Sequence, residues 1–290
     1  MWAPVSSRNA QTQVTQGFSL ILWNIDAFSS RAVSRAKLIL GHILEGPKSP
    51  DIIFLQEVTS AVRASLLDDA RVRAAFLVTD AEDQTSFEKV PFATMTFLSS
   101  ARFASSLDSQ KEGDGIEGEG RLMFGRVSRV ALPSKYGRDA LCVDITSPTA
   151  IFRLINVHLD SLGDTLHYRA QQMEILADVL REPGCGGGII AGDFNAISAE
   201  DEGLVDRNKL VDAWVALHGR ADPDGATWGV GVERLDGLGA GRLDKVAMMG
   251  SKAEEMEVLH PGPIEVPRPG EKSVEIPWSD HCGLRCTFTI

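Results

Sequence analysis

The sequence predicts an α/β fold in which runs of strands are interrupted by a few long helices, as in a layered sandwich. The segments LILW (20–23) and IIFL (52–55) are apolar throughout, which indicates strands whose two sheet faces are both covered. Three strand-like segments follow one another directly at 122–132, 139–146 and 150–159. This succession favours antiparallel pairing of neighbouring strands.

The first half of the chain alternates strands with helices. After a strand at 18–23, the segment 29–47 predicts a helix with Ser29 or Ser30 as its N-cap and Pro47 just beyond its end. The apolar residues on one face of this helix are Ala32, Ala36, Ile39 and Ile43. The next predicted elements are a strand at 51–55, a helix at 60–76 and a strand at 91–99.

The second half contains the clearest helix, at 165–181, which Pro183 and Gly184 end. Its apolar residues recur at helical spacing, and they are Leu166, Ala170, Met173, Ala177 and Leu180. Further strands are expected leading into GDFN (192–195), in GRLDKVAMMG (241–250) and in HCGLRCTFTI (281–290). The segment 105–120 mixes glycines with acids, which predicts an exposed loop.

The composition is that of an ordinary globular protein, with 43% hydrophobic and 24% charged residues. The formal net charge of −11 argues against an electrostatic binder of nucleic acid, although a local basic groove stays open. The four cysteines form no CxxC pair, and no histidine cluster accompanies them at zinc spacing. We therefore expect reduced thiols and an intracellular protein of the nucleus or cytoplasm.

The chain is expected to form a single domain at 17–290 after a flexible tail at 1–16. The tail lacks the apolar core of a signal peptide. No segment approaches the roughly 20 apolar residues that a membrane helix needs. We expect a monomer without a membrane partner.

Polar residues stand at the ends of five predicted strands. In chain order they are Asn24 and Asp26, Gln56 and Glu57, His158 to Ser161, Asp193 and Asn195, and Ser279 to His281. Each ending alone is equally well explained as a turn or a helix cap. If the strand ends converge, the carboxylates raise one another's pKa values unless a cation lies among them. Oxygen ligands without paired cysteines point to Mg²⁺ or Mn²⁺ as that cation.

Six motifs in one order carry a family resemblance: LWNID (22–26), LQEV (55–58), NVHLDS (156–161), GDFN (192–195), GRLDKV (241–246) and SDH (279–281). Over 18–290 the chain thereby resembles the endonuclease/exonuclease/phosphatase superfamily of metal-dependent phosphohydrolases. The segments most similar to its tyrosyl-DNA phosphodiesterase 2 branch are LPSKYGRDALCVDI (132–145), HLDSLGDT (158–165) and ATWG (226–229). The resemblance implies a four-layer αββα sandwich of two mixed, mostly antiparallel sheets, the DNase I-like fold.

The resemblance also implies a metal site. Glu57 is implied as the main ligand of Mg²⁺ or Mn²⁺, with Asn24 beside it. Asp26 and Asp280 are expected near the metal, directly or through water. A metal in this place polarises a phosphoryl oxygen and offsets the charge of the transition state.

The implied catalytic residues follow the other strand ends. Asp193 is expected to orient and deprotonate the attacking water, and Asn195 to hold the phosphate or Asp193 itself. His281 is expected to donate to a non-bridging phosphate oxygen, with Asp244 as the carboxylate that orients it. His158 is expected to be a second histidine that contacts the phosphate.

Two further residues are implied at the substrate. Ser161 neighbours the second histidine, and Trp228 matches an aromatic residue that packs against nucleic acid. Plain structural explanations stay open for some positions: Asp160 as a solvated strand end or cap, Trp228 as ordinary packing, and Arg242 with Asp244 as a surface pair.

These residues support three hypotheses. The first is a metal-dependent phosphodiesterase that hydrolyses phosphodiester bonds, including DNA ends and 5′-tyrosyl-DNA linkages. The second keeps the chemistry but has a small metabolite or a lipid headgroup as substrate. It is favoured by the acidic charge and by Gly229, which stands where the tyrosyl-DNA branch tends to have an acid. The third is a catalytically silent binding module, which the complete motif set disfavours.

Overall fold

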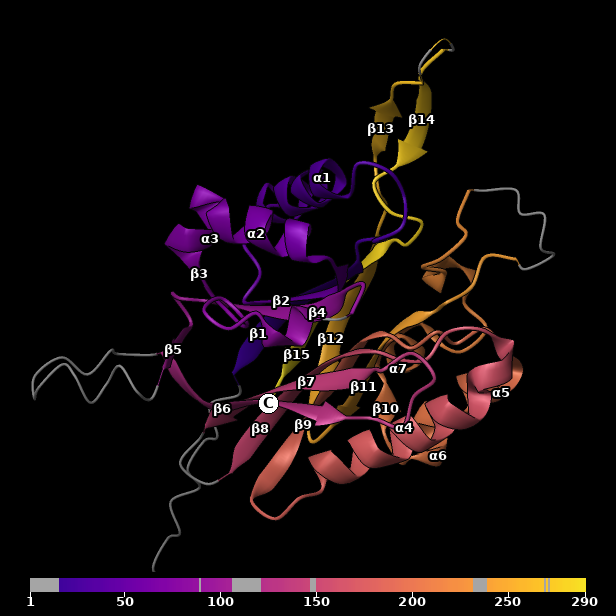
Figure 1. The fold of residues 1–290 in the computed structure, drawn as a ribbon. Helices are drawn as coiled ribbons and strands as arrows, with labels where there is room; N and C mark the ends of the chain where they lie inside the picture. Colours follow the sequence, from indigo (N-terminus) through magenta and orange to yellow (C-terminus); the bar gives the residue numbers. More distant parts are fainter. Residues whose placement is uncertain are drawn as a thin grey trace, which may run out of the picture.

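The computed structural model describes residues 16–88, 90–105, 121–146, 150–231, 239–268, 270 and 272–290. Two sheets pack face to face, with helices on the outer face of each (Figure 1). This arrangement confirms the predicted four-layer αββα sandwich. The predicted tail at 1–16 and loop at 105–120 lie, apart from Gln16 and Ser105, outside the described residues.

The first sheet has the strand order β12-β15-β1-β2-β4-β3. Its strands are β1 (Gly17–Asn24), β2 (Ile52–Val58), β3 (Phe76–Val78), β4 (Ala93–Ser99), β12 (Lys252–Leu259) and β15 (Gly283–Thr289). The neighbours β1 and β2 run parallel, and the other pairs of this sheet run antiparallel. Asn24 and Glu57 therefore reach the same edge of the sheet.

The second sheet has the order β10-β11-β9-β8-β7-β6-β5. Its strands are β5 (Phe103–Ser105), β6 (Leu122–Ala131), β7 (Asp139–Thr146), β8 (Ile151–His158), β9 (Cys185–Asp193), β10 (Val211–Asp212) and β11 (Asp244–Met249). The predicted antiparallel succession is confirmed, because β6 pairs with β7 and β7 with β8. The parallel pair β8 and β9 sets His158 beside Asp193.

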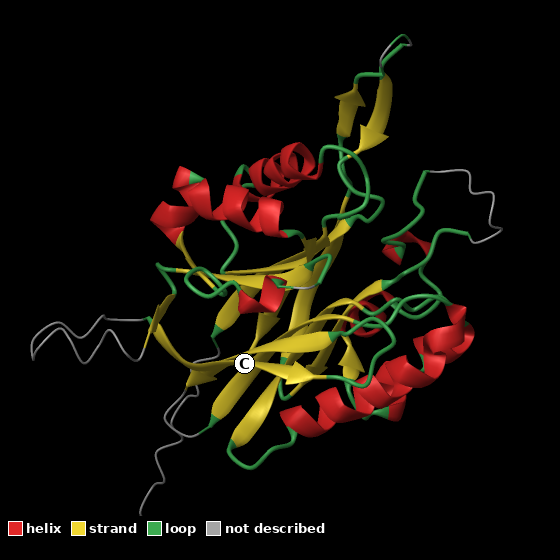
Figure 2. Ribbon diagram, viewed as in Figure 1, coloured by secondary structure: helices red, strands yellow, loops and turns green. Residues whose placement is uncertain are grey.

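Helices cover both outer faces of the sandwich (Figure 2). Over the first sheet lie α1 (Ala32–Leu44), α2 (Ser60–Asp68) and α3 (Ala70–Ala75); over the second lie α4 (Leu166–Leu180), α5 (Ala199–Glu202) and α6 (Leu204–Arg207). The short helix α7 (Ala213–His218) packs against β11 and β12 at the edge between the sheets. The hairpin of β13 (Pro263–Val266) and β14 (Val274–Pro277) projects from the body (Figure 1).

Three buried apolar layers follow from the alternation of side chains along each strand. On β1, Leu20 and Leu22 enter the core between the sheets, whereas Ile21 and Trp23 pack under the helices. The third layer lies between the second sheet and α4, and it includes Met173 of that helix. Both faces of β1 are thus covered, as its unbroken apolar sequence predicts.

Two predictions about helix ends were wrong. Neither Ser29 nor Ser30 caps α1, because the helix begins after Arg31, which has φ 61° and makes no side-chain cap bond. The predicted helix at 60–76 is two helices. Asp69 separates them with ψ 123° and caps the second one by accepting from the backbone N–H of Arg71.

Of the two plain explanations expected for Asp160, a solvated strand end or a cap, the solvated strand end is wrong. It is fully buried, and its carboxylate accepts from the Ser134 hydroxyl and, at 2.7 Å, from the backbone N–H of Lys135. The Gln172 side chain on α4 donates to the same carboxylate. Asp160 therefore fastens the segment before β7 to the end of β8.

Two further expectations concern the whole chain. The four cysteines are free thiols in this structure. Among the described residues, no helix is both long and apolar enough to cross a membrane.

A buried ion pair joins α4 to α5 and yields a stability prediction. Arg169 and Asp201 are both fully buried and bond through two nitrogens, at 2.7 and 2.9 Å. Removing one partner strands a buried charge, so Asp201→Ala should lose about 3–5 kcal/mol of unfolding free energy in urea titrations. The control is Asp206→Ala, which breaks the exposed pair with Arg220 and should stay within about 1 kcal/mol of wild type. Equal losses in the two variants would contradict this.

Candidate active site

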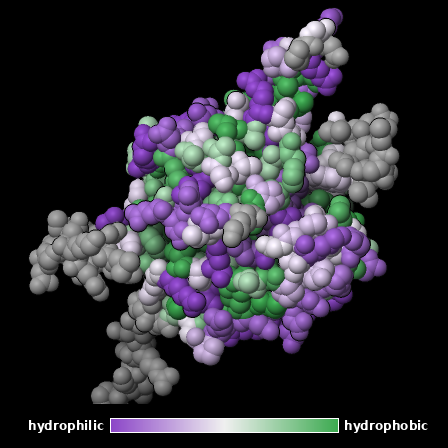
Figure 3. Space-filling model, in the orientation of Figure 1, coloured by the Kyte–Doolittle hydropathy of each residue, from purple (hydrophilic) through white to green (hydrophobic). Residues whose placement is uncertain are grey.

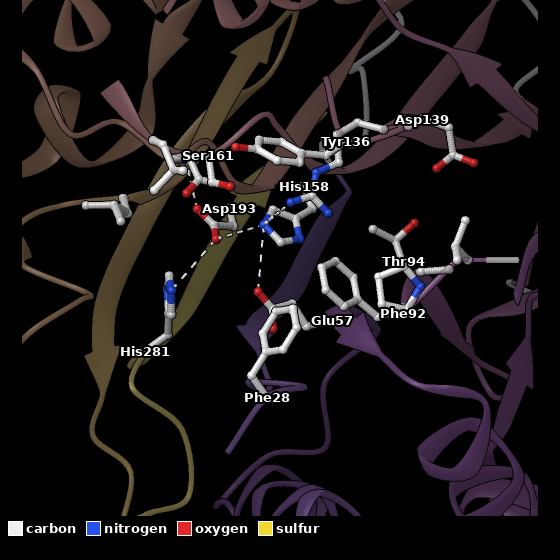
Figure 4. Close-up of a pocket in the computed structure, with 18 of the residues that line it drawn as sticks. Phe28, Glu57, Phe92, Thr94, Tyr136, Asp139, His158, Ser161, Asp193 and His281 are labelled. Carbon is white, nitrogen blue, oxygen red and sulfur yellow. Dashed lines mark hydrogen bonds and ion pairs between the residues drawn. The ribbon is translucent and has the colours of Figure 1, made fainter. Parts of the chain in front are cut away.

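Strand ends from both sheets meet around a pocket of about 710 Å³ (Figure 4). Asn24 ends β1, His158 ends β8 and Asp193 ends β9. The residues predicted from the sequence that line this pocket are Glu57, His158, Ser161, Asp193, Asn195, Trp228, Asp280 and His281. The five polar strand ends therefore converge, which is the condition of the charge argument.

Asn24 joins the carboxylates of the two sheets. Its Nδ2 donates to Asp193 Oδ2 at 2.9 Å and lies 3.3 Å from Glu57 Oε1. Its Oδ1 accepts from the backbone N–H of Asp26 at 3.0 Å. This buried amide fixes the position of one acid from each sheet relative to the other.

A bulge in β2 turns Glu57 toward the pocket. The pairing of β2 with β4 shifts between Leu55 and Val58, and Glu57 has φ 57°. Its Oε2 accepts from the backbone N–H of Ala27 at 2.8 Å. Burial raises the pKa of this carboxyl, and nearby Asp280 adds to the effect. A neighbouring cation would therefore stabilise the ionised form.

Asp244 contacts the His281 ring. The His281 Nδ1 lies 2.7 Å from Asp244 Oδ2, and its Nε2 lies 3.7 Å from Asp193 Oδ2. In β11, Asp244 pairs directly with Asp193 of β9, which sets both acids beside the ring. Burial opposes a charge on His281, but the two carboxylates outweigh it and raise its pKa to about 10. The ring is thus an imidazolium whose Nε2–H faces the pocket.

Asp193 is the acid most affected by its surroundings. Burial raises its pKa to about 7, although His281 and the bond from Asn24 favour the charged form. Its Oδ1 accepts from the backbone N–H of Asn195 at 2.8 Å. The Asn195 side chain donates to Leu159 O at 2.9 Å, so this amide holds the turn after β9.

His158 stays neutral between the acids. Its Nε2 lies 3.4 Å from Asp193 Oδ2 and 3.9 Å from Glu57 Oε1 (Figure 4). Burial lowers its pKa well below the usual value, and the positive charge of Arg138 acts in the same direction. Its ring stacks on Phe92 with centroids 5.5 Å apart. The side chain is therefore suited to donate a hydrogen bond without carrying charge.

Two sets of residues could hold a metal ion. Ligand atoms of Asp193, Asp244 and His281 lie within 4.8 Å of one another. However, Asp244 and His281 are already bonded to each other, so we attribute this group to hydrogen bonding. Glu57 supplies carboxylate oxygens of the kind that hard divalent cations prefer, and its crowding with Asp193 around the Asn24 Nδ2 calls for a positive charge. The Asn24 Oδ1 accepts from the backbone N–H of Asp26, so this amide faces the two acids with its nitrogen. The donor set beside Glu57 therefore fits the implied metal.

Asp26 and Asp280 lie beside this set with other contacts. Asp26 accepts from the backbone N–H groups of Phe28 and Ser29, and its Oδ2 lies 3.4 Å from the buried guanidinium of Arg35. Asp280 is exposed and accepts from the Trp228 indole at 3.2 Å. The carboxylate of Asp26 thus mainly shapes the turn after β1.

The structure adds site residues to which the sequence assigned no role. The guanidinium carbon of Arg138 lies 5.1 Å from the Phe92 ring centre and 5.7 Å from that of Tyr136. Phe28 packs edge-on against Phe92, and these rings lie around His158 (Figure 4). Arg138 belongs to the KYGRD segment that carried the resemblance, so its position was a signal, but its contact with His158 depends on the fold.

The surface-pair explanation of Arg242 and Asp244 was wrong. Arg242 pairs with Glu202 and Asp212, and Asp244 is fully buried against His281. Asp244 therefore contacts a residue of the site, and Arg242 has other partners.

Asp193 gives a pH-dependent stability prediction for the metal-free protein. Its folded pKa of about 7 exceeds the value of about 3.9 for an unfolded aspartate, so the folded state favours the protonated form. The group therefore costs stability as pH rises from about 4 to 7, and the cost is constant above that. In urea titrations with chelator, the unfolding free energy of Asp193→Asn should exceed that of wild type by about 2–4 kcal/mol at about pH 8. At about pH 4 the two unfolding free energies should be nearly equal. A difference independent of pH would contradict this assignment.

Comparisons with known proteins agree with this fold. The model of the Endonuclease/Exonuclease/phosphatase family matches residues 21–281. The chain is similar to a crystal structure of humanized D. rerio TDP2, with 21% identity, TM-score 0.66 and coverage of 94% of this chain and 98% of that one. It is also similar to D. rerio TDP2 complexed with single strand DNA product (20% identity, TM-score 0.67, coverage 94% and 98%).

A third similar structure is the human Nocturnin catalytic domain with bound sulfate anion, at 18% identity, TM-score 0.60 and coverage of 98% and 99%. Among curated proteins, no sequence matches this chain. At these identities the solved structures establish the fold, whereas the family model spans most of the sequence. The chain belongs to the endonuclease/exonuclease/phosphatase family, whose members hydrolyse phosphoester bonds.

Proposed function

We propose that this protein is a phosphodiesterase that requires a divalent metal, Mg²⁺ or Mn²⁺. The observation that carries the proposal is the meeting of Asn24, Glu57, His158, Asp193 and His281 within hydrogen-bonding or ion-pair distance at one pocket. A packed core has no need of this set, because buried like charges destabilise a fold. Retaining them is consistent with catalysis.

Asp193 is the proposed general base. A carboxyl whose pKa lies near 7 can accept a proton from water at neutral pH and release it afterwards. Asn24 and the backbone N–H of Asn195 hold its two oxygens. The base therefore has a fixed direction toward the pocket.

His281 and His158 are the proposed donors to the phosphate. His281 carries a positive charge that Asp244 maintains, so it stabilises negative charge developing on a phosphoryl oxygen. His158 is neutral and offers a second hydrogen bond from the other side of Asp193. Two donors that flank the base can orient the phosphorus for attack by water.

Glu57 is the proposed main metal ligand, with Asp280 alongside. Asn24 would join them through its Oδ1 only if its amide turned, because here its Nδ2 faces Glu57 and Asp193. A divalent ion held there supplies Lewis-acid polarisation of a phosphoryl oxygen. Arg35 contributes a fixed, fully buried positive charge near Asp26 and Asp280. This one charge neutralises the acids around Glu57 only in part, which leaves room for a divalent cation.

The aromatic wall of the pocket supports a substrate with a ring near the phosphate. Phe92, Tyr136 and Trp228 line the pocket together with Arg138, and a guanidinium beside aromatic rings can stack with a further ring. A base at a DNA end or a 5′-tyrosyl group both fit this description. We therefore propose DNA ends and 5′-tyrosyl-DNA linkages as the first substrate class.

The charge of the pocket supports the alternative, a small phosphoester. Among the described lining residues, the acids Glu57, Asp139, Asp193 and Asp280 outnumber the cations, which are Arg138 and the imidazolium of His281. A polyanionic duplex needs a series of cationic contacts along its backbone. A single phosphate of a metabolite or a lipid headgroup needs far fewer.

A substrate panel separates these classes. The protein with Mg²⁺ is incubated with a 5′-tyrosyl oligonucleotide, a plain duplex, an abasic duplex and an aryl phosphodiester, and product is measured. We expect turnover of the tyrosyl substrate above the plain duplex, because the ring can occupy the aromatic wall. Turnover of the small ester alone would favour the alternative, and no turnover with metal bound would favour a silent binding module.

The roles of two site residues can be tested on any active substrate of that panel. Asp193→Asn and His281→Ala should each lower kcat by about 10³-fold or more, because each removes proton transfer or charge stabilisation. Circular dichroism should show both variants folded. The matched control is His167→Ala, an exposed histidine outside the pocket lining, which should keep wild-type kcat. Site variants within tenfold of wild type would contradict the roles.

A further inference from the structure

Leu162 has a backbone conformation that glycine alone adopts easily. Its φ is 75° and its ψ is 160°, a region that is essentially restricted to glycine. It directly precedes Gly163, so a glycine is available one position away. A leucine in this strained conformation suggests a functional role for its side chain.

Buried bonds impose this conformation. The Leu162 carbonyl accepts from Arg169 Nη1 at 2.8 Å and from the Thr165 hydroxyl at 2.9 Å. Arg169 is in turn fixed by its two bonds to Asp201, and both residues are fully buried. The buried side chains of Arg169 and Thr165 therefore fix the backbone at Leu162.

The side chain that this support presents is exposed at the pocket. Leu162 is 59% exposed and lines the same pocket as Asp193 and His281. On the face shown in Figure 3, apolar residues lie in separate patches among hydrophilic ones. Among the described residues, the large apolar side chains that are exposed are Phe28, Leu38, Val127, Tyr136, Leu162 and Val211. Three of them, Phe28, Tyr136 and Leu162, line this one pocket.

We propose that Leu162 determines specificity by forming a rigid contact with an apolar or aromatic group esterified to the phosphate of the substrate. The inference rests on the proposed function and names which part of the substrate this residue selects. A preset apolar contact favours such a group because no ordering of the loop is needed on binding. The strained backbone is retained because it aims the side chain into the pocket.

Three variants separate the backbone from the side chain. Leu162→Ala and Leu162→Gly both remove the apolar contact, but only glycine relieves the strain. Leu162→Met keeps an apolar side chain of similar volume. We expect the glycine variant to unfold at a higher temperature than the alanine variant, the reverse of the usual order. If alanine is the more stable, the backbone is not held as described and the proposal fails.

Selectivity is measured with two diesters that share one leaving group, phenyl p-nitrophenyl phosphate and methyl p-nitrophenyl phosphate. The ratio of kcat/KM for phenyl over methyl should fall about tenfold in the alanine and glycine variants and persist in Leu162→Met. The matched control is Val211→Ala, an apolar residue 51% exposed on β10 and outside the pocket lining, whose ratio should equal that of wild type. An unchanged ratio in the alanine and glycine variants would overturn the proposal.

A binding measurement keeps this outcome distinct from failure of the proposed function. Phenylphosphonate and methylphosphonate are titrated by calorimetry into the Mg²⁺-loaded wild type and variants. We expect the preference of wild type for phenylphosphonate to fall in parallel with the kinetic ratio. If wild type hydrolyses neither diester and no substrate of the panel above, the proposed function is contradicted, and the phosphonate preference still decides the role of Leu162. A preference equal in wild type and Leu162→Ala overturns that role.

Discussion

The chemistry of the site depends on how closely the two sheets approach at the ends of β1, β2, β8 and β9. Across this interface, Gln56 Nε2 donates to Asn156 Oδ1 at 2.8 Å, one residue before Glu57 and two before the histidine that ends β8. A Cβ at Gly192 would lie 3.2 Å from Gln56 Nε2 of the first sheet and 2.0 Å from Val157 O on the neighbouring β8, so β9 tolerates no side chain just before Asp193. This close packing brings acids from two sheets within reach of one asparagine amide, Asn24. A looser sandwich would leave the same residues as separate solvated strand ends.

The same region concentrates backbone strain. Of the seven described non-glycine residues with positive φ, four belong to the site or its pocket: Asp26, Glu57, Leu162 and Asn195. Each such residue costs about 1–3 kcal/mol, which the large three-layered core offsets. The strain has a common geometric result, because it turns side chains at strand ends out of the sheet direction. If Glu57 had extended backbone, its side chain would follow the regular alternation of side chains between the two faces of β2. Its carboxylate would then point away from the pocket.

The layered α/β architecture and the convergence of polar strand ends could be predicted from local sequence patterns, whereas the four-layer fold and the roles of single residues were implied by the family resemblance. Apolar strands followed by acids, amides or imidazoles are local patterns, and parallel neighbours bring such ends together. What these patterns could not give was pairing that depends on distant elements. The burial of Asp160 required the segment of Ser134 to lie over it, and the role of Arg138 required Phe92 from the other sheet. Asp69 is a local signal for the start of a new helix, because an aspartate can serve as an N-cap. It was missed because the helical pattern continues on both sides of it.

The charges of the pocket couple the binding of metal and substrate. Glu57, Asp193 and Asp280 outnumber the cations His281 and Arg138 that line the same space, so a phosphate anion meets net repulsion in the metal-free protein. A divalent cation removes that repulsion, and by thermodynamic linkage a bound phosphate raises the affinity for the cation by the same factor. In the proposed mechanism, the acids beside Glu57 therefore have a second effect besides holding the cation. They make a phosphoester a poor ligand until the cation is bound, which limits unproductive binding.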